Sequence, residues 1–140
     1  MLTRNRTEVA LPNVRYVAAD VFRWEPEATY DVVFFGFFLS HVPPRAFDPF
    51  WRLVRACMRE RGRVAFVDED DRAAGNDEVR LLDGVPVARR TLSDGREFDV
   101  VKVFWNPEEL ATTLRPLGWD VTIRRVGSGF IYGLGVDTGT

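Results

Sequence analysis

The chain has 140 residues, enough for one domain, and its formal net charge of −2 gives no electrostatic reason to expect nucleic acid or an anionic membrane as partner. Hydrophobic residues make up 46% of the chain, as in ordinary globular proteins, and no apolar run approaches the roughly 18 residues of a membrane span. One cysteine excludes an internal disulfide and residues 1–8 lack a secretory signal, so we expect a cytoplasmic location.

The first thirty-five residues predict two strands. A polar, weakly helical segment over residues 1–11 ends at a turn around Pro12. Residues 14–19 are short, β-branched and apolar, which is typical of a strand, and they stop at Asp20. Residues 30–35 are apolar at successive positions, which indicates a strand buried on both faces.

A helix and a further strand follow. Pro43 and Pro44 start the helix, and apolar residues then recur at three- and four-residue steps. Basic residues in the last turn and Gly62 predict its end, and residues 63–68 form the next buried strand. A strand–helix–strand unit of this kind predicts parallel pairing with a right-handed crossover.

The second half predicts mainly antiparallel structure. Residues 70–84 are polar and predict a loop, and residues 85–92 and 96–104 flank an Asp-Gly turn, a strong hairpin signal. Asn106 suits a helix N-cap, and that helix should stop at Gly118.

The last two predicted strands are residues 119–126 and 130–136. They surround a short Gly-Ser-Gly connection over residues 127–129, so the pair should be antiparallel.

Three segments, taken in order, carry a resemblance to a known family. VRYVAADVF over residues 14–22, YDVVFFG over 30–36 and GRVAFVD over 62–68 resemble the third, fourth and fifth strands of class I S-adenosylmethionine-dependent methyltransferases, and SHVP over 40–43 resembles the segment after the fourth. The resemblance implies a Rossmann-like α/β fold in one partial domain over residues 1–140, with an inserted hairpin over 85–104. It also implies S-adenosyl-L-methionine as cofactor and a small-molecule methyl acceptor.

The family's first strand with its glycine-rich turn, and its second strand, have no match in this sequence, so we expect an N-terminally truncated fold that lacks the first two strands. Those parts supply about three hydrogen bonds to charged groups, each worth about 1.5–3 kcal/mol, so the chain alone should be weak or inactive. In the family the two missing strands lie between the strands that residues 14–19 and 30–35 resemble. We therefore expect residues 14–19 to pair directly with 30–35, or else a second copy of the chain in a homodimer or a separate missing half to fill the place of the missing strands. A non-catalytic binding or oligomerisation module is the alternative; the absent glycine motif argues against an oxidoreductase.

The resemblance also implies roles for Asp20, Val21, Gly36 and Phe37, and His41 is a further candidate on its own chemistry. Asp20 and the Val21 amide would meet the adenine, since a carboxylate is a strong acceptor for an amino group, and Gly36 and Phe37 would lie along the methionine part. His41 would take a proton from the acceptor, because it is the only histidine. The plainer alternatives are that Asp20 caps a turn, Gly36 reverses the chain and His41 bonds backbone.

Other residues favour structural interpretations. Trp24, Phe37, Phe38 and Trp105 could line a substrate pocket but are more typical of plain core. Arg89, Arg90 and Lys102 on the hairpin fit a solvated face better than an acidic substrate. No metal site is expected, since ligand spacing is lacking.

Overall fold

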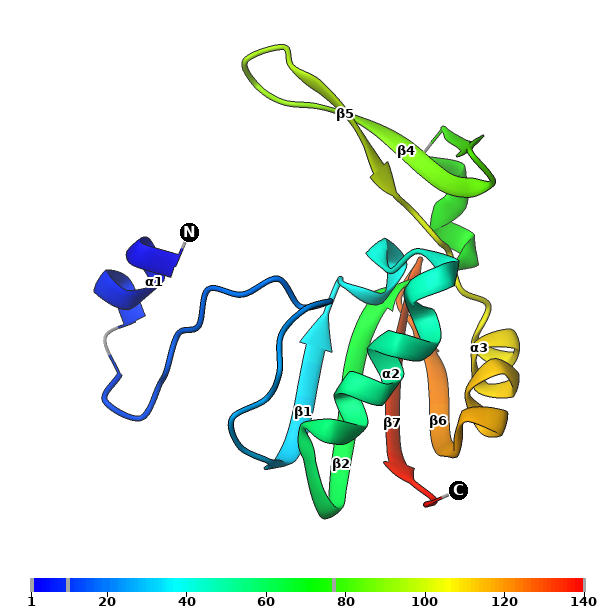
Figure 1. The fold of residues 1–140 in the computed structure, drawn as a ribbon. Helices are drawn as coiled ribbons and strands as arrows, with labels where there is room; N and C mark the ends of the chain where they lie inside the picture. Colours follow the sequence, from blue (N-terminus) through cyan, green and yellow to red (C-terminus); the bar gives the residue numbers. More distant parts are fainter. Residues whose placement is uncertain (1, 10, 77, 140) are drawn as a thin grey trace.

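The structure, a computed structural model that describes residues 2–9, 11–76 and 78–139, is built on a four-stranded mixed sheet (Figure 1). The strand order is β1–β2–β7–β6. The strands are β1 (Tyr30–Gly36), β2 (Met58–Glu69), β6 (Trp119–Val126) and β7 (Phe130–Asp137). Strands β1 and β2 are parallel, and β7 is antiparallel to both β2 and β6. The parallel pairing of β1 with β2 and the antiparallel pairing of β6 with β7 confirm these two expectations from the sequence.

A separate antiparallel sheet projects beyond the carboxyl ends of β1 and β2 (Figure 1). It contains β3 (Val79–Leu82), β4 (Val85–Thr91) and β5 (Glu97–Val101). The predicted hairpin is confirmed as β4 and β5. Strand β3 was not expected, because residues 70–84 read as a polar loop; they form a 3-10 helix (Asp71–Asn76) and then pair with β4.

Helices cover one face of the main sheet. They are α2 (Phe47–Ala56) and α3 (Pro107–Leu114), and the side chain of Asn106 caps α3 as predicted by accepting from the Glu108 and Glu109 amides. Helix α1 (Leu2–Val9) stands away from the sheet (Figure 1). Within the described residues no helix is long and apolar enough to cross a membrane.

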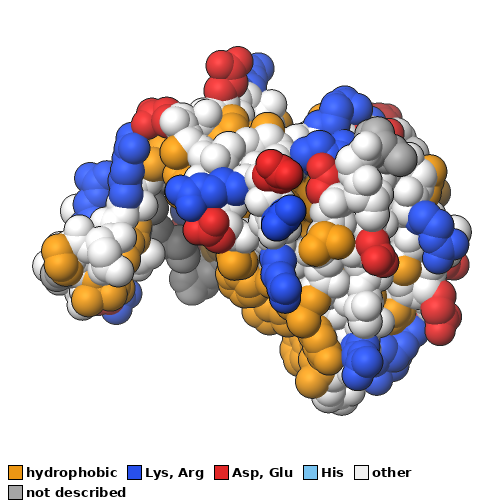
Figure 2. Space-filling model, turned by 90° about the horizontal axis from the view of Figure 1, so that it is seen from below, with side chains coloured by type: hydrophobic (Ala, Val, Ile, Leu, Met, Phe, Trp, Pro, Cys, Tyr) orange, Lys and Arg blue, Asp and Glu red, His pale blue; other side chains and the backbone are white. Residues whose placement is uncertain are grey.

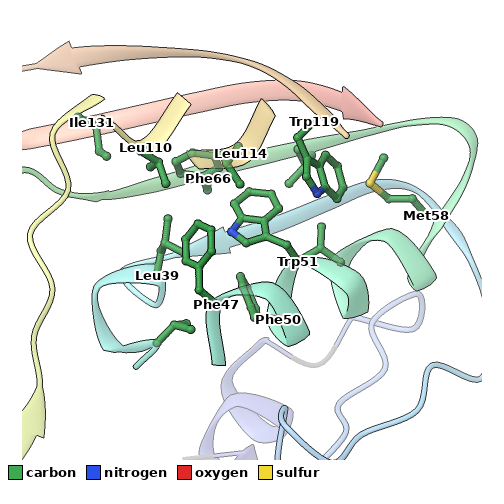
Figure 3. Packing of buried hydrophobic residues seen from close by; sticks show 13 residues of the cluster. Leu39, Phe47, Phe50, Trp51, Met58, Phe66, Leu110, Leu114, Trp119 and Ile131 are labelled. Atoms are coloured by element: carbon green, nitrogen blue, oxygen red, sulfur yellow. The ribbon is translucent and has the colours of Figure 1, made fainter. Parts of the chain in front are cut away.

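Aromatic side chains fill the core between the helices and the sheet (Figure 3). The ring of Trp51 on α2 packs edge-on against Trp119 on β6, with centroids 5.0 Å apart, and against Phe66 on β2 at 5.9 Å. Gly133 on β7 lies beneath the Phe66 ring, where a Cβ would fall 2.2 Å from a ring carbon. This close approach lets the large rings pack directly on the sheet.

The opposite face of the sheet carries no helix in the described part of the chain. The register places Phe34, Ala65 and Leu134 in one row across this face, and Phe34 and Leu134 are 66% and 56% exposed. Hydrophobic side chains gather in a band along the lower margin of Figure 2. We call the face formed by Val32, Phe34, Ala65, Val67 and Leu134 the bare face. The prediction that residues 30–35 are buried on both faces is therefore wrong.

Residues 14–19 form no strand, and the predicted direct pairing with residues 30–35 is also wrong. Strand β1 is at the end of the sheet, so nothing pairs with its outer edge among the described residues. The segment is instead tied locally, by an ion pair between Arg15 and Glu27 and a bond from Arg6 to the Tyr16 carbonyl. An apolar, β-branched segment becomes a strand only where a neighbouring backbone offers a ladder.

Helix α2 ends earlier than predicted. A 3-10 turn (Pro44–Ala46) precedes it, and its last carbonyls accept from the Cys57 amide. The Tyr30 amide then donates to the Cys57 carbonyl, so β2 begins at Met58, and the basic residues predicted for the last helical turn lie in this strand.

Candidate functional site

The candidate site lies where the parallel strands β1 and β2 end side by side. Open α/β sheets bind ligands at this edge, so the segments that leave the two strands are the first place to look. The Phe37 amide donates to the Val67 carbonyl at 2.8 Å, and the buried Asp68 carboxylate accepts from the Ser40 amide at 3.0 Å. These bonds fold the segment after β1 across the end of β2.

Asp20 lies in a turn beside this segment rather than at the end of a strand. One carboxylate oxygen accepts from the Phe22 amide at 3.0 Å, and the other is 3.8 Å from the Arg23 guanidinium. The turn brings the Phe22 ring to 6.2 Å from that of Phe38. Asp20 therefore caps a turn, which was the plainer alternative, while its exposed carboxylate keeps further acceptor positions.

An apolar crevice of 190 Å³ connects this turn with the edge of β1. Its lining includes Val21 and Trp24 near the turn, Phe35 and Phe38 in and after β1, and residues of helix α2. The crevice is smaller than the roughly 300–1,000 Å³ of a typical ligand pocket, so it can take one ring system and not a whole dinucleotide-sized ligand.

Gly36 and Phe37 make the sharp exit from β1. A Cβ on Gly36 would lie 3.3 Å from Val67, so only glycine sits here without displacing that side chain. Phe37 has a φ of +53°, a strained conformation for a bulky residue, and its half-exposed ring meets Phe130 edge-on. Strained residues of this kind concentrate at ligand-binding loops.

His41 follows on a one-turn 3-10 helix (Leu39–His41) and is exposed. Its Nδ1 lies 2.7 Å from the Val101 carbonyl oxygen at the end of β5. The imidazole therefore bonds backbone, as the plainer alternative expected, and the partner is a distant strand of the second sheet. Nε2 makes no hydrogen bond to any described residue and is left for other contacts.

No local sequence pattern indicates that a charge is buried beside His41. Lys102 is 4% exposed, so its placement on a solvated face is wrong; its ammonium pairs with Glu69 and lies 3.4 Å from Ser40 Oγ. A buried charge persists only with a partner, which Glu69 at the end of β2 provides. The one available signal was that Lys102 is the only lysine in a chain that otherwise uses arginine.

The other hairpin and aromatic residues have structural roles. Arg89 pairs with Asp99 and Glu97 across the hairpin, as expected for a solvated face. Trp105 packs on Phe47 with ring centroids 5.0 Å apart, so it belongs to the core.

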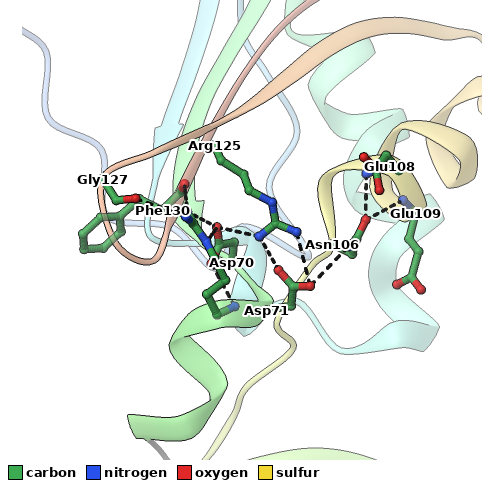
Figure 4. Close-up of polar contacts among 9 residues, drawn as sticks. Asp70, Asp71, Asn106, Glu108, Glu109, Arg125, Gly127 and Phe130 are labelled. Atoms are coloured by element: carbon green, nitrogen blue, oxygen red, sulfur yellow. Dashed lines mark hydrogen bonds and ion pairs between the residues drawn. The ribbon is translucent and has the colours of Figure 1, made fainter.

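A polar network braces the end of β2 on its other side (Figure 4). Asp70 is buried and pairs with Arg72 and Arg125, and Arg125 also pairs with Asp71, which accepts from Asn106. Burial acts to raise the pKa of Asp70, but the hydrogen bonds from Arg72 and Arg125 outweigh it and lower the pKa. The bond from Arg125 is the main cause that lowers the pKa of Asp71.

The described residues offer no metal centre. Within residues 2–9, 11–76 and 78–139 no three His, Cys, Asp or Glu side chains converge as ligands. Cys57 is free and buried, and burial raises the pKa of its thiol, which disfavours the reactive thiolate.

Comparison with known proteins gives matches only among solved structures. No family model matches, and no curated protein matches. A complex of DhpI with SAH shares 36% identity over 99% of this chain with a TM-score of 0.82, and a DhpI–SAM–HEP complex shares 38% over 96% with 0.83. The chain spans only 62% and 63% of the length of those two chains.

More distant structures agree in fold. The PH0226 protein of Pyrococcus horikoshii OT3 is 17% identical over 96% of this chain and 66% of its own, with a TM-score of 0.69. An S-adenosylmethionine-dependent methyltransferase from Clostridium acetobutylicum is 13% identical over 98% of this chain and 69% of its own, with a TM-score of 0.64.

Proposed function

This chain belongs to the S-adenosylmethionine-dependent methyltransferases, and from that premise we propose that it serves in methyl transfer from S-adenosyl-L-methionine to a small molecule. The observation that carries the proposal is the identity of 36–38%, over almost the whole chain, to a protein crystallised with SAH and with SAM. The bound cofactor would supply an electrophilic methyl group, and the residues of this chain would bind and orient the reactants.

The described residues fit one end of such a cofactor. The exposed Asp20 carboxylate suits an exocyclic amino group, and the apolar crevice beside Val21 suits a flat ring. The close turn at Gly36 and Phe37 brings backbone to the same edge of the sheet. These residues are our candidates for cofactor binding.

His41 is our candidate for the proton transfer. A protonated oxygen or nitrogen acceptor must lose a proton as it is methylated, and a neutral imidazole is the side chain suited to take it near pH 7. Nδ1 is engaged by the Val101 carbonyl, which leaves Nε2 as the nitrogen that would accept the proton.

We propose that this chain alone binds the cofactor weakly. The crevice of 190 Å³ accommodates only part of such a molecule, and the match leaves more than a third of the length of the two DhpI chains without a counterpart here. Without partners for the remaining polar groups of the cofactor, each lost charged hydrogen bond would cost about 1.5–3 kcal/mol of affinity.

Titration with S-adenosylhomocysteine, followed by amide NMR, tests the location of the cofactor site and the weak affinity. We expect the amide signals of Asp20, Val21, Gly36 and Phe37 to shift without saturating below millimolar ligand. In Asp20→Ala the shifts at positions 20 and 21 should be lost. An exposed acid on the hairpin provides the control, since Glu97→Ala should leave the shifts unchanged. Shifts confined to other residues would contradict the site, and tight saturable binding would contradict the weak affinity.

A second candidate function is a binding or oligomerisation module. The observation in its favour is the bare face together with the unpaired outer edge of β1, an apolar surface of a kind that usually pairs or aggregates. The partner would be a second copy of the chain or a separate polypeptide that supplies a strand and an apolar cover.

Light scattering during size-exclusion chromatography distinguishes these partners. A concentration-dependent increase in mass that Phe34→Ser abolishes would favour self-association through the bare face. The control is Phe98→Ser, which removes a similarly exposed ring from β5. A monomer at all concentrations would exclude the homodimer.

A further inference from the structure

The only lysine of the chain is buried at the junction between the two sheets. Lys102 follows β5, and its ammonium contacts the Glu69 carboxylate, the Ser40 hydroxyl and the face of the Phe104 ring, whose centroid is 5.1 Å away. A charge buried to this extent is costly unless its partners are held in place, so the arrangement fixes Lys102 and Glu69 relative to each other.

The two contacts of the Lys102 ammonium, with Ser40 and with Glu69, bring together segments that are far apart in sequence. Ser40 belongs to the one-turn helix after β1, and Glu69 ends β2. The Val103 amide donates to the Ser40 carbonyl at 2.8 Å, directly beside the contact of Lys102 with the Ser40 hydroxyl. The chain leaving β5 is therefore clamped to the segment that carries His41.

The residue before Lys102 makes the contact with the imidazole. A backbone carbonyl only accepts hydrogen bonds, so the Val101 oxygen, 2.7 Å from His41 Nδ1, requires the proton to be on Nδ1. In a neutral imidazole the other nitrogen, Nε2, then carries the lone pair. Three successive residues therefore contact the one-turn helix (Leu39–His41): Val101 with its carbonyl oxygen, Lys102 with its ammonium and Val103 with its amide.

We propose that Lys102 and Glu69 are positioning residues that fix the proton of His41 on Nδ1. Their ion pair holds the end of β5 against the one-turn helix, and this places the Val101 carbonyl at the imidazole. Docking of the second sheet therefore favours the tautomer in which Nε2 carries the lone pair. The use of Nε2 as a base rests on the proposed function, whereas the tautomer does not.

Imidazole nitrogen NMR tests the proposal directly, because a chain with one histidine gives one pair of ring ¹⁵N signals. At about pH 9, well above the ordinary histidine pKa of about 6.5, the shifts of Nδ1 and Nε2 report which nitrogen carries the proton. We expect the Nδ1–H form in the unmodified chain. In Lys102→Met the ratio should move about fivefold toward Nε2–H, the equivalent of one ordinary hydrogen bond.

Two further variants separate positioning from folding. Glu69→Gln removes the ion pair while keeping the size of the side chain, and it should shift the tautomer ratio in the same direction. This variant keeps the test valid if Lys102→Met does not fold. Lys102→Arg keeps the charge and should restore the Nδ1–H form. Arg80→Met, which breaks an ion pair to Asp99 inside the second sheet, is the matched control and should leave the ratio unchanged.

A proton on Nε2 in the unmodified chain would overturn the proposal. So would an unchanged ratio in Glu69→Gln, or a control variant that moves the ratio as much as that one. These measurements need no cofactor, so a failure to bind S-adenosylhomocysteine would refute the proposed function and leave the assignment of the proton intact.

Discussion

Gly133 is the residue on which the packing of the core aromatic rings depends most. Three atoms of the Phe66 ring lie within 2.8 Å of the position that a Cβ would occupy, and the ring is held between Trp51 and Phe35. A buried ring between two others cannot move aside without displacing them.

We therefore expect Gly133→Ala to lower the free energy of unfolding by about 1–3 kcal/mol, the usual cost of overpacking a core. Gly75→Ala is the control, because nothing lies within 4 Å of a Cβ there. Urea denaturation of the three proteins measures the difference. Equal stability of the two variants would show that the sheet adjusts more easily than the packing implies.

At the scale of elements, the end of β2 is held by charged groups on both sides. On one side Asp70 joins β2 to the turn between β6 and β7 through Arg72, whose guanidinium also donates to the Gly127 and Phe130 carbonyls (Figure 4). On the other side Glu69 pairs with Lys102 of the second sheet. Glu69, the last residue of β2, and Asp70, the residue after it, thus attach two different elements.

The lowered pKa of Asp70 makes the first attachment dependent on pH. A carboxyl whose pKa is lower in the folded state stabilises the protein fully above its unfolded pKa of about 3.9 and loses that effect as the pH falls through the folded value. Asp70→Asn should be less stable than the parent at pH 7 by about 1–3 kcal/mol, and the difference should shrink below about pH 4.

Unfolding curves at several pH values measure this difference. The control is Asp83→Asn, an exposed acid in a tight turn with no ion pair among the described residues, which should track the parent at every pH. A constant difference between Asp70→Asn and the parent down to pH 2 would contradict the assignment.

Most elements of the second half of the chain could be predicted, because their signals are local. Asn106 caps the start of α3, and Gly118, with a positive φ of 81°, ends the 3-10 turn (Arg115–Leu117) that follows α3; both are properties of the residues themselves. The hairpin and the last two strands follow from turn residues and alternation in the same way.

The errors arose where structure depends on a distant neighbour. Among the described residues, no strand pairs with residues 14–19 despite their strand composition, and none pairs with the outer edge of β1, which has the composition of a buried strand. The pairing of Lys102 with Glu69 joins residues 33 positions apart, and no local pattern encodes it. For the candidate site, the sequence therefore indicated which residues to consider, but not which groups they contact.

At the scale of the whole molecule, stability is distributed unevenly along the chain. Strands β2 and β7 are paired on both sides within the sheet, whereas residues 11–29 form no helix or strand and make few backbone hydrogen bonds. Opening of such a segment costs little compared with opening of the central strands.

Native-state hydrogen exchange should show this contrast. We expect the amides of residues 11–29 to exchange at nearly unprotected rates and those of β2 and β7, in the middle of the sheet, to exchange only through global unfolding. If the bare face is covered by a partner in solution, added protection should appear in the edge strand β1. Uniform protection over the whole chain would be inconsistent with the fold.

The pair of indole rings in the core has a practical consequence. Trp51 comes from the helix layer and Trp119 from the edge strand β6, and their rings meet only when the two layers are packed together. Since fixed aromatic surroundings give rise to the near-ultraviolet circular dichroism that loosely packed states lose, this contact supplies an intrinsic optical signal for the docking of α2 on the sheet. The order in which layers assemble can therefore be followed without any added label.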